Sequence, residues 1–238
     1  MNIKVVLFDL DGTLLPMENS DLFVKTYFNS LAKKLAPLGY NPDHLVKSVW
    51  QGTTAMMTNP GNMTNQQLFW NTFAGIYGEQ SKQHVCHFEE YYKTDFDIVK
   101  TVCGFNKKSK EIVDEIKKMG LRVALATNPL FPSVATEKRI KWAGLSPEDF
   151  ELYTTYENHR YSKPNTNYYL EVTKLLNVKP EECLMVGNDA TEDMAAEELG
   201  MKVFLLTDCL LNKKDKDISS YPQGSFDDLL KYIKEDLA

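Results

Sequence analysis

Residues 5–13, with the sequence VVLFDLDGT, decide the fold and point to the chemistry of this chain. A short apolar run bounded by turn signals is typical of a strand buried on both faces. Side chains two positions apart on an extended chain share a face, so Asp9 and Asp11 project together where the strand ends. Their charges repel unless a cation lies between them, and hard oxygen ligands favour Mg²⁺. Gly12 then allows a turn in which backbone amides approach an anion.

The bulk composition predicts a protein that acts on a small molecule. A chain of 238 residues can bury one good core and carry a second small domain or an insertion. The net charge of −6, without a block of Lys or Arg, argues against a nucleic-acid or anionic-membrane partner. The sequence shows neither a membrane span nor a signal peptide, so we expect a cytoplasmic protein that is a monomer or a homodimer.

From residue 121 onward, apolar strands alternate with helical patterns. This alternation predicts a parallel sheet covered on both faces. We expect strands at 121–126, 152–155 (weaker), 183–186 and 203–206, and helices at 132–142, 165–176, 191–199 and 226–234.

The stretch from Met17 to about Val99 lacks a convincing strand and reads as a helical insertion. Apolar residues recur at helical spacing in 21–35 and in 65–77, which favours a small helical bundle. The polar, turn-rich stretch 51–62 is predicted to be a loop, either a connector or a lid tip facing a substrate.

Polar side chains follow the predicted strands where the carboxyl ends of parallel strands meet. Thr127 and Asn128 follow the second strand, Asp189 and Asp193 follow the fourth, and Lys163 lies in a loop before a helix. Each has an ordinary structural explanation as a helix cap, a first-turn acid or a surface lysine. Together with Asp9 and Asp11, however, they form a constellation suited to binding a metal and a phosphate.

These motifs, DLDGT at 9–13, Thr127-Asn128, Lys163-Pro164 and Gly187-Asn188-Asp189 through Asp193, resemble the four motifs of the haloacid dehalogenase (HAD) superfamily. The resemblance implies a Rossmann-like hydrolase core at 1–15 and 100–238, with a helical cap of the subfamily I type at 16–99. The chain departs from the family pattern at Asn188, where many members read Gly-Asp directly, and at Asn165, where Asp is common.

The resemblance implies a Mg²⁺-dependent phosphatase acting on a small-molecule phosphate monoester. Asp9 would be the nucleophile, Asp11 the general acid and base, and Lys163 a positive charge beside Asp9. The metal ligands would be Asp9, the backbone carbonyl of Asp11, and Asp189, with Asp193 direct or through water. The phosphoryl group would be bound by Thr127, Asn128, Gly12 and Thr13.

Several alternatives stay open at this point. Asp11 argues against a 2-haloacid dehalogenase, whose leaving group needs no acid. A phosphomutase or a phosphonate hydrolase of the same superfamily is possible, the latter if Lys25, Lys33, Lys34 or Lys47 forms a Schiff base. A phospho-receiver signalling protein is the rival from another class. For substrate specificity we nominate Gln51, Thr53, Thr54, Met56 and Met57 in the insertion, together with Phe23 and Lys25.

Overall fold

The computed structural model describes residues 3–237 and is built around a five-stranded sheet. Its order is β2-β1-β3-β4-β5, and every neighbouring pair is parallel. The predicted α/β fold with a parallel sheet is therefore confirmed. The strands are β1 (Val5–Phe8), β2 (Arg122–Leu125), β3 (Cys183–Gly187), β4 (Lys202–Leu206) and β5 (Gln223–Gly224).

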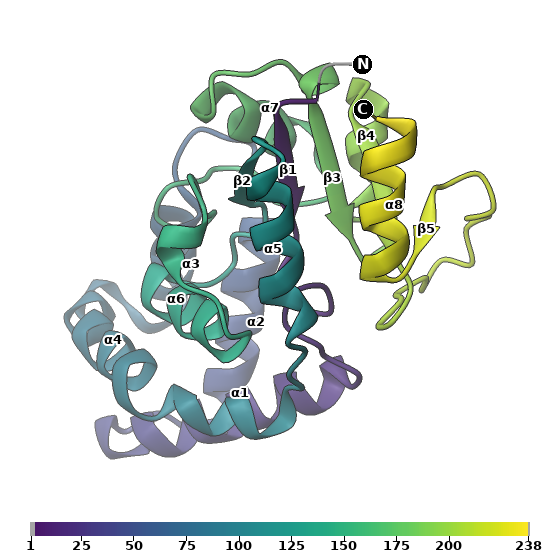
Figure 1. Ribbon diagram of the computed structural model, residues 1–238. Helices are drawn as coiled ribbons and strands as arrows, with labels where there is room; N and C mark the ends of the chain where they lie inside the picture. Colours follow the sequence, from purple (N-terminus) through teal and green to yellow (C-terminus); the bar gives the residue numbers. More distant parts are fainter. Residues whose placement is uncertain (1–2, 238) are drawn as a thin grey trace.

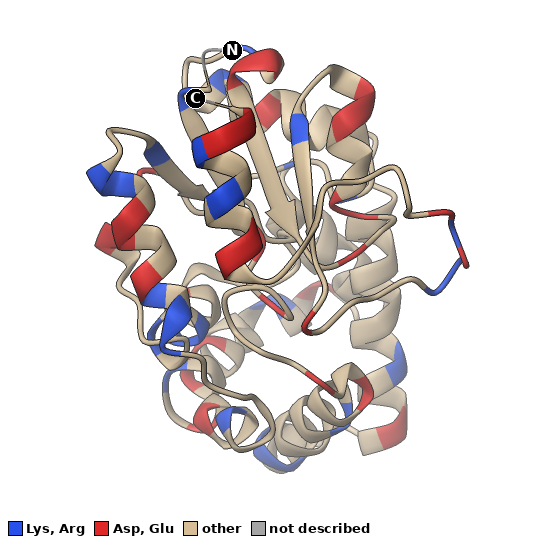
Figure 2. Ribbon diagram, turned by 45° about the vertical axis from the view of Figure 1, so that its right-hand side comes forward, with Lys and Arg blue, Asp and Glu red and all other residues tan. Residues whose placement is uncertain are grey.

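Alternate residues of strands β1 to β4 enter two separate cores, one on each face of the sheet. Val6 and Phe8 pack on the face covered by α5 (Lys108–Lys118), α6 (Ser133–Trp142) and α8 (Phe226–Asp236). Val5 and Leu7 pack on the opposite face, against α7 (Thr166–Leu175) and the 3-10 helix η6 (Met194–Leu199). Both faces of these strands are apolar, and burying each such side chain contributes about 1.5–3 kcal/mol to the free energy of folding. Charged residues are carried mainly by the helices and loops around the sheet (Figure 2).

The chain between β1 and β2 is helical, as the sequence predicts. In Figure 1 these helices lie beyond the arrowheads of β1 and β3, so they face the carboxyl ends of the strands. We call residues 20–102 the helical segment. It comprises α1 (Ser20–Leu35), α2 (Pro42–Met57), α3 (Asn65–Tyr77), α4 (Val85–Thr94) and 3-10 helices at Ala36–Leu38, Glu79–His84 and Phe96–Val102.

The prediction of a loop over 51–62 was wrong for its first half, because α2 continues to Met57. Gly52 belongs to this stretch and is of a residue type that favours turns. In the structure it lies inside the helix and against the ring of Phe69 on α3, where a Cβ atom would collide with that ring. The glycine therefore permits close helix packing, and the helix ends only before Thr58.

Two predicted elements after β2 are also shorter than expected. The stretch 152–155 forms a single bridge, between Leu125 and Tyr153, rather than a strand. The predicted helix at 191–199 is a turn followed by η6, since the Asp189 carboxylate accepts the amides of Thr191 and Glu192 and tightens that turn. Within residues 3–237, no helix is long and apolar enough to cross a membrane.

Candidate active site

The carboxyl ends of β1, β2 and β3 lie at one edge because the strands are in register. Phe8 pairs with Leu125 on one side and with Val186 on the other. The residues that follow open into a cavity of about 260 Å³. Its lining includes most of the predicted site residues, namely Asp9, Asp11, Thr127, Asn128, Asp189 and Asp193.

Lys163 supplies a buried positive charge beneath this cavity. Its side chain is 1% exposed, and Nζ donates to Oδ1 of Asp9 at 2.9 Å and to Oδ1 of Asp193 at 2.7 Å. Burial alone would lower the pKa of Lys163, but Asp193 and Asp9 outweigh it and hold the pKa well above its ordinary value. The ammonium is therefore charged at neutral pH and ties two strand ends together.

Asp9 is the carboxylate best placed to act as a nucleophile. It directly follows β1 and is 8% exposed at the cavity wall. Burial raises the pKa of Asp9, and the neighbouring Lys163 ammonium opposes that rise. A carboxylate with little water around it and one fixed cation is less solvated, and so more reactive, than a carboxylate on the surface.

The position of Thr127 is fixed by two hydrogen bonds to its backbone carbonyl. Its carbonyl accepts hydrogen bonds from the Thr154 hydroxyl at 2.5 Å and the Tyr168 hydroxyl at 2.9 Å. Asn128 is held in turn, since its Oδ1 accepts the backbone amide of Lys163 at 3.2 Å. This segment after β2 is therefore rigidly connected to the loop that carries the lysine.

Asp11 is paired with a residue that sequence reasoning missed. Arg139 on α6 donates to Oδ2 of Asp11, is 1% exposed, and stacks on the ring of Phe131, with 4.5 Å from its Cζ atom to the ring centroid. The other carboxylate oxygen, Oδ1, is buried and has no hydrogen-bond partner among the described residues. The sequence does carry a signal for this pairing. Arg139 lies one turn after Ala135 on the apolar face of α6, and a buried arginine there needs an acidic partner.

In the segment after β3, the Asp193 carboxylate holds neighbouring groups in place. Oδ1 of Asp193 accepts from Lys163, and Oδ2 accepts the amide of Asp189 at 2.9 Å. Asn188, which departs from the family pattern, accepts from the Thr13 hydroxyl at 3.0 Å and donates to the carbonyl of Cys209 at 2.7 Å. It connects the loops after β1, β3 and β4, and it fills the space beside Gly12, whose φ of +83° favours glycine.

Two further groups in the cavity were not predicted as site residues. Glu192 accepts from Nδ2 of Asn128 at 2.9 Å, and burial raises its pKa to about 7. Lys213 also lines the cavity. The loop that carries it, between β4 and β5, extends from the body of the molecule (Figure 2).

The donor set fits a magnesium ion. Within residues 3–237, no three His, Cys, Asp or Glu side chains form a ready metal cluster. Mg²⁺ in phosphoryl-transfer sites, however, takes one or two carboxylates and completes its shell with water and substrate oxygens. Asp9 and Asp189 line the same cavity and could supply those carboxylates. Both oxygens of Asp193 are already engaged, which suits a supporting position rather than direct ligation.

The nominated specificity residues lie away from this cavity. Thr54 is exposed, whereas Met56 is 1% exposed in the core and its carbonyl accepts the hydroxyl of Ser162. Of the other nominated residues, Phe23, Thr53 and Met57 line a second, apolar cavity.

His159 lies beneath the site and makes the stability of the protein depend on pH. Its ring is fully buried near Tyr168, with centroids 5.9 Å apart, and burial lowers its pKa from 6.5 to about 4. The unfolded chain therefore binds the proton more readily, so this contribution to stability is present above pH 6.5 and is lost as the pH falls towards 4.

We expect the free energy of unfolding to fall by about 2 kcal/mol between pH 7 and pH 5 through His159 alone. Urea unfolding of the wild type and of His159→Gln at both pH values measures this contribution, since Gln does not titrate. The pH-dependent loss should be smaller in the variant, and equal losses would contradict the assignment.

Comparison with known proteins agrees with this geometry. The sequence model of the haloacid dehalogenase-like hydrolase family matches residues 3–200, and the chain belongs to that family of hydrolases. Among curated proteins, Pyrophosphatase PpaX of Bacillus cereus is 25% identical over 202 residues, which cover 85% of this chain and 82% of the relative.

Two solved structures share the fold along nearly the whole chain. The 2-haloacid dehalogenase of Pseudomonas syringae aligns with a TM-score of 0.63 and 17% identity, covering 99% of this chain and 100% of the other. YfnB of Bacillus subtilis, solved with magnesium bound, aligns with a TM-score of 0.55 and 14% identity, covering 98% and 99%.

Proposed function

We propose that this hydrolase is a Mg²⁺-dependent phosphatase that cleaves a small-molecule phosphate monoester through an aspartyl-phosphate on Asp9. The observation that carries the proposal is the Asp9 carboxylate, bound to Lys163, in a cavity that also holds Asp11 and Thr127. Pairing a nucleophile with a general acid two residues away suits a leaving group that must be protonated.

Each residue has a definite task in this mechanism. A carboxylate oxygen of Asp9 forms a bond to phosphorus while the bond from phosphorus to the alcohol oxygen breaks. Asp11 gives its proton to the departing alkoxide, then takes a proton from the water that attacks the phosphoaspartate. Arg139 holds Oδ2 of Asp11, which leaves Oδ1 to carry that proton. Free phosphate and the Asp9 carboxylate result.

The remaining groups would hold the phosphoryl oxygens. The Thr127 hydroxyl and the Asn128 side chain line the cavity beside Asp9 and would bind these oxygens, and Lys163 adds a fixed positive charge. The backbone amides of Gly12 and Thr13 already donate to the carbonyls of Leu15 and Leu10, which favours Thr127 and Asn128 over the Gly12 turn for this role. Mg²⁺, held by Asp9 and Asp189 and by the backbone carbonyl of Asp11, would neutralise substrate charge against the Asp9 carboxylate when bound.

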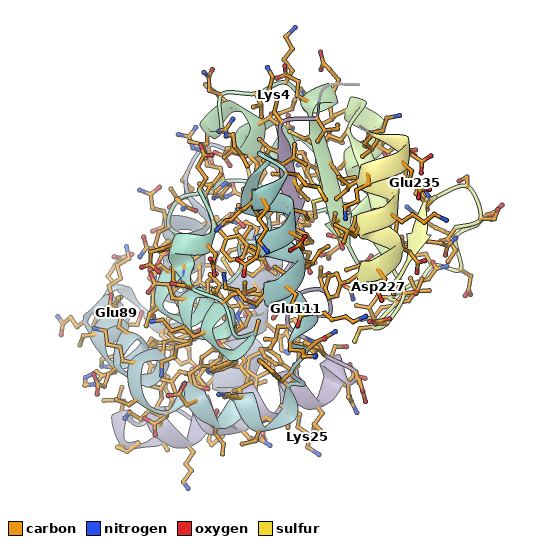
Figure 3. The ribbon with its side chains drawn as sticks, in the orientation of Figure 1. Lys4, Lys25, Glu89, Glu111, Asp227 and Glu235 are labelled. Carbon is orange, nitrogen blue, oxygen red and sulfur yellow. The ribbon has the colours of Figure 1, made fainter. Side chains whose placement is uncertain are left out.

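The structure bears on one alternative within the superfamily. A phosphonate hydrolase would need a lysine from the helical segment. Lys25, Lys33 and Lys47 are exposed, and Lys34 pairs with Asp95 at 2.7 Å. Figure 3 shows Lys25 at the edge of the helical segment away from the sheet. Within the described residues, none of the four lines the catalytic cavity, which favours ester hydrolysis.

Pyrophosphate is a second candidate substrate. The name of the Bacillus cereus relative refers to this activity, and Lys213 at the cavity wall could bind a second phosphate group. A phosphomutase differs only in what happens to the aspartyl-phosphate, so direct measurement of released phosphate separates it from a hydrolase.

The test is phosphate release from p-nitrophenyl phosphate, metabolite phosphates and pyrophosphate, with Mg²⁺ and with a chelator. We expect many turnovers with Mg²⁺ and a fall of roughly 10²–10⁴-fold with the chelator, since a metal supplies several kcal/mol of charge stabilisation. At most one equivalent of phosphate would indicate a phospho-receiver. Turnover unaffected by the chelator would contradict the metal dependence.

A further inference from the structure

A second cavity of about 290 Å³ lies between the helical segment and residues 130–132. We call it the apolar chamber. Aromatic and aliphatic side chains from α1, α2, α3 and α4 form its walls, among them Phe23, Tyr27, Val49 and Trp70, and Phe131 adds a ring from the loop after β2. Within the described chain, its lining contains no Lys, Arg or His, and its one charged residue is Glu89. Glu89 is exposed and lies at the outer edge of the helical segment (Figure 3).

The apolar chamber lies next to the catalytic cavity. Leu130 and Phe131 line both, and they follow Thr127 and Asn128 directly along the chain. On α1, Ser20 lines the catalytic cavity and Phe23, one turn later on the same helix face, lines the chamber. Two separate elements therefore lead from the position of the phosphoryl group into apolar surroundings.

We propose that the apolar chamber holds the leaving group, so that the substrate is the phosphate monoester of an apolar alcohol, aliphatic or aromatic. This inference rests on the proposed phosphatase function and names its substrate class. An apolar cavity of about 150 Å³ is enough to bind benzene. A chamber of 290 Å³ has room for a bicyclic ring or a medium-length alkyl chain.

The chemistry of the products agrees with this placement. When the phosphorus–oxygen bond breaks, the alkoxide takes the proton of Asp11 and becomes a neutral alcohol, and the phosphoryl group stays on Asp9. A neutral apolar alcohol suits walls of this kind. A carboxylate or a second phosphate in the chamber would lose its water without gaining a cation.

The first test is a series of straight-chain alkyl phosphates from ethyl to octyl, with glycerol phosphate as the polar comparison. We expect kcat/KM to rise by up to roughly fourfold for each added methylene until the chamber is full. A value that does not change with chain length, or a preference for glycerol phosphate, would overturn the proposal.

A matched pair of variants locates the effect. Thr53→Phe places a ring in the chamber and should remove most of the gain in kcat/KM from chain length. Thr101→Phe makes the same exchange at an exposed position of the helical segment, outside both linings, and should behave as wild type. Equal effects of the two variants would also overturn the proposal.

Binding of 1-octanol gives a readout that needs no turnover, because Trp50 and Trp70 both line the chamber. We expect a saturable change in tryptophan fluorescence in the wild type and in Asp9→Asn, and its loss in Thr53→Phe. Saturable binding without phosphatase activity would reject the proposed function but support the chamber. Phosphatase activity without saturable binding or chain-length dependence would reject the chamber alone.

Discussion

Replacing Asp9 by Asn is expected to lower Mg²⁺-dependent phosphate release by at least about 10³-fold. The amide has nearly the shape of the carboxylate, but it is a poor nucleophile and cannot form the aspartyl-phosphate. The exchange also removes one of the two negative charges beside Lys163, whose Nζ lies 2.9 Å from Asp9. Steady-state release from p-nitrophenyl phosphate measures the effect, and a melting curve shows that the variant is folded.

Asp11→Asn provides the comparison that separates nucleophile from acid. An alkyl alkoxide needs a proton on departure, whereas p-nitrophenolate leaves without one. We therefore expect Asp11→Asn to slow alkyl phosphates by roughly 10²–10⁴-fold and p-nitrophenyl phosphate far less. If Asp9→Asn kept appreciable turnover, Asp9 would not be the nucleophile.

Lys163→Met is expected to cost about 3–5 kcal/mol of folding stability at neutral pH, together with the activity. The lysine is 1% exposed between Asp9 and Asp193. Its removal leaves two buried carboxylates without their cation, and breaking a buried ion pair on one side is strongly destabilising. Urea unfolding in the presence of a chelator measures the loss without a contribution from bound metal.

The double variant Lys163→Met/Asp193→Asn is the control for this explanation. Because it removes one of the uncompensated charges, it should be more stable than Lys163→Met alone, with a coupling of about 0.5–3 kcal/mol between the two sites. Strictly additive effects would show that the ammonium and the Asp193 carboxylate do not interact in the folded protein.

The elements that the sequence predicted correctly are those with strong local patterns. Strands β1 to β4 are apolar runs, and α1 carries Phe23, Phe28 and Leu31 at helical spacing toward the core. The prediction failed where tertiary contacts decide the outcome. Gly52 continues a helix because Phe69 of another helix packs against it, which no local pattern reveals.

The candidate site shows the same division. Asp9, Thr127 and Asp189 were predictable because each follows a strand, and parallel strands place these positions at one edge. The partners of Asp11 and Asn128 could not be predicted in this way. Arg139 is 128 residues from Asp11 along the chain, and Glu192 is 64 residues from Asn128. Contacts between residues so far apart in the sequence depend on how the helices pack on the sheet.

The order of synthesis separates Asp9, the proposed nucleophile, from the partners that surround it in the folded protein. Strand β1 lies in the interior of the sheet, yet it is made first and must wait for both neighbouring strands. Asp9 precedes its lysine partner by 154 residues, which takes roughly 8–30 s at ribosomal speeds of about 5–20 residues per second. During that interval the nascent chain carries an apolar segment without its final partners. Any activity that depends on the ion pair of Asp9 with Lys163 can therefore appear only after this later part of the chain has been made and packed.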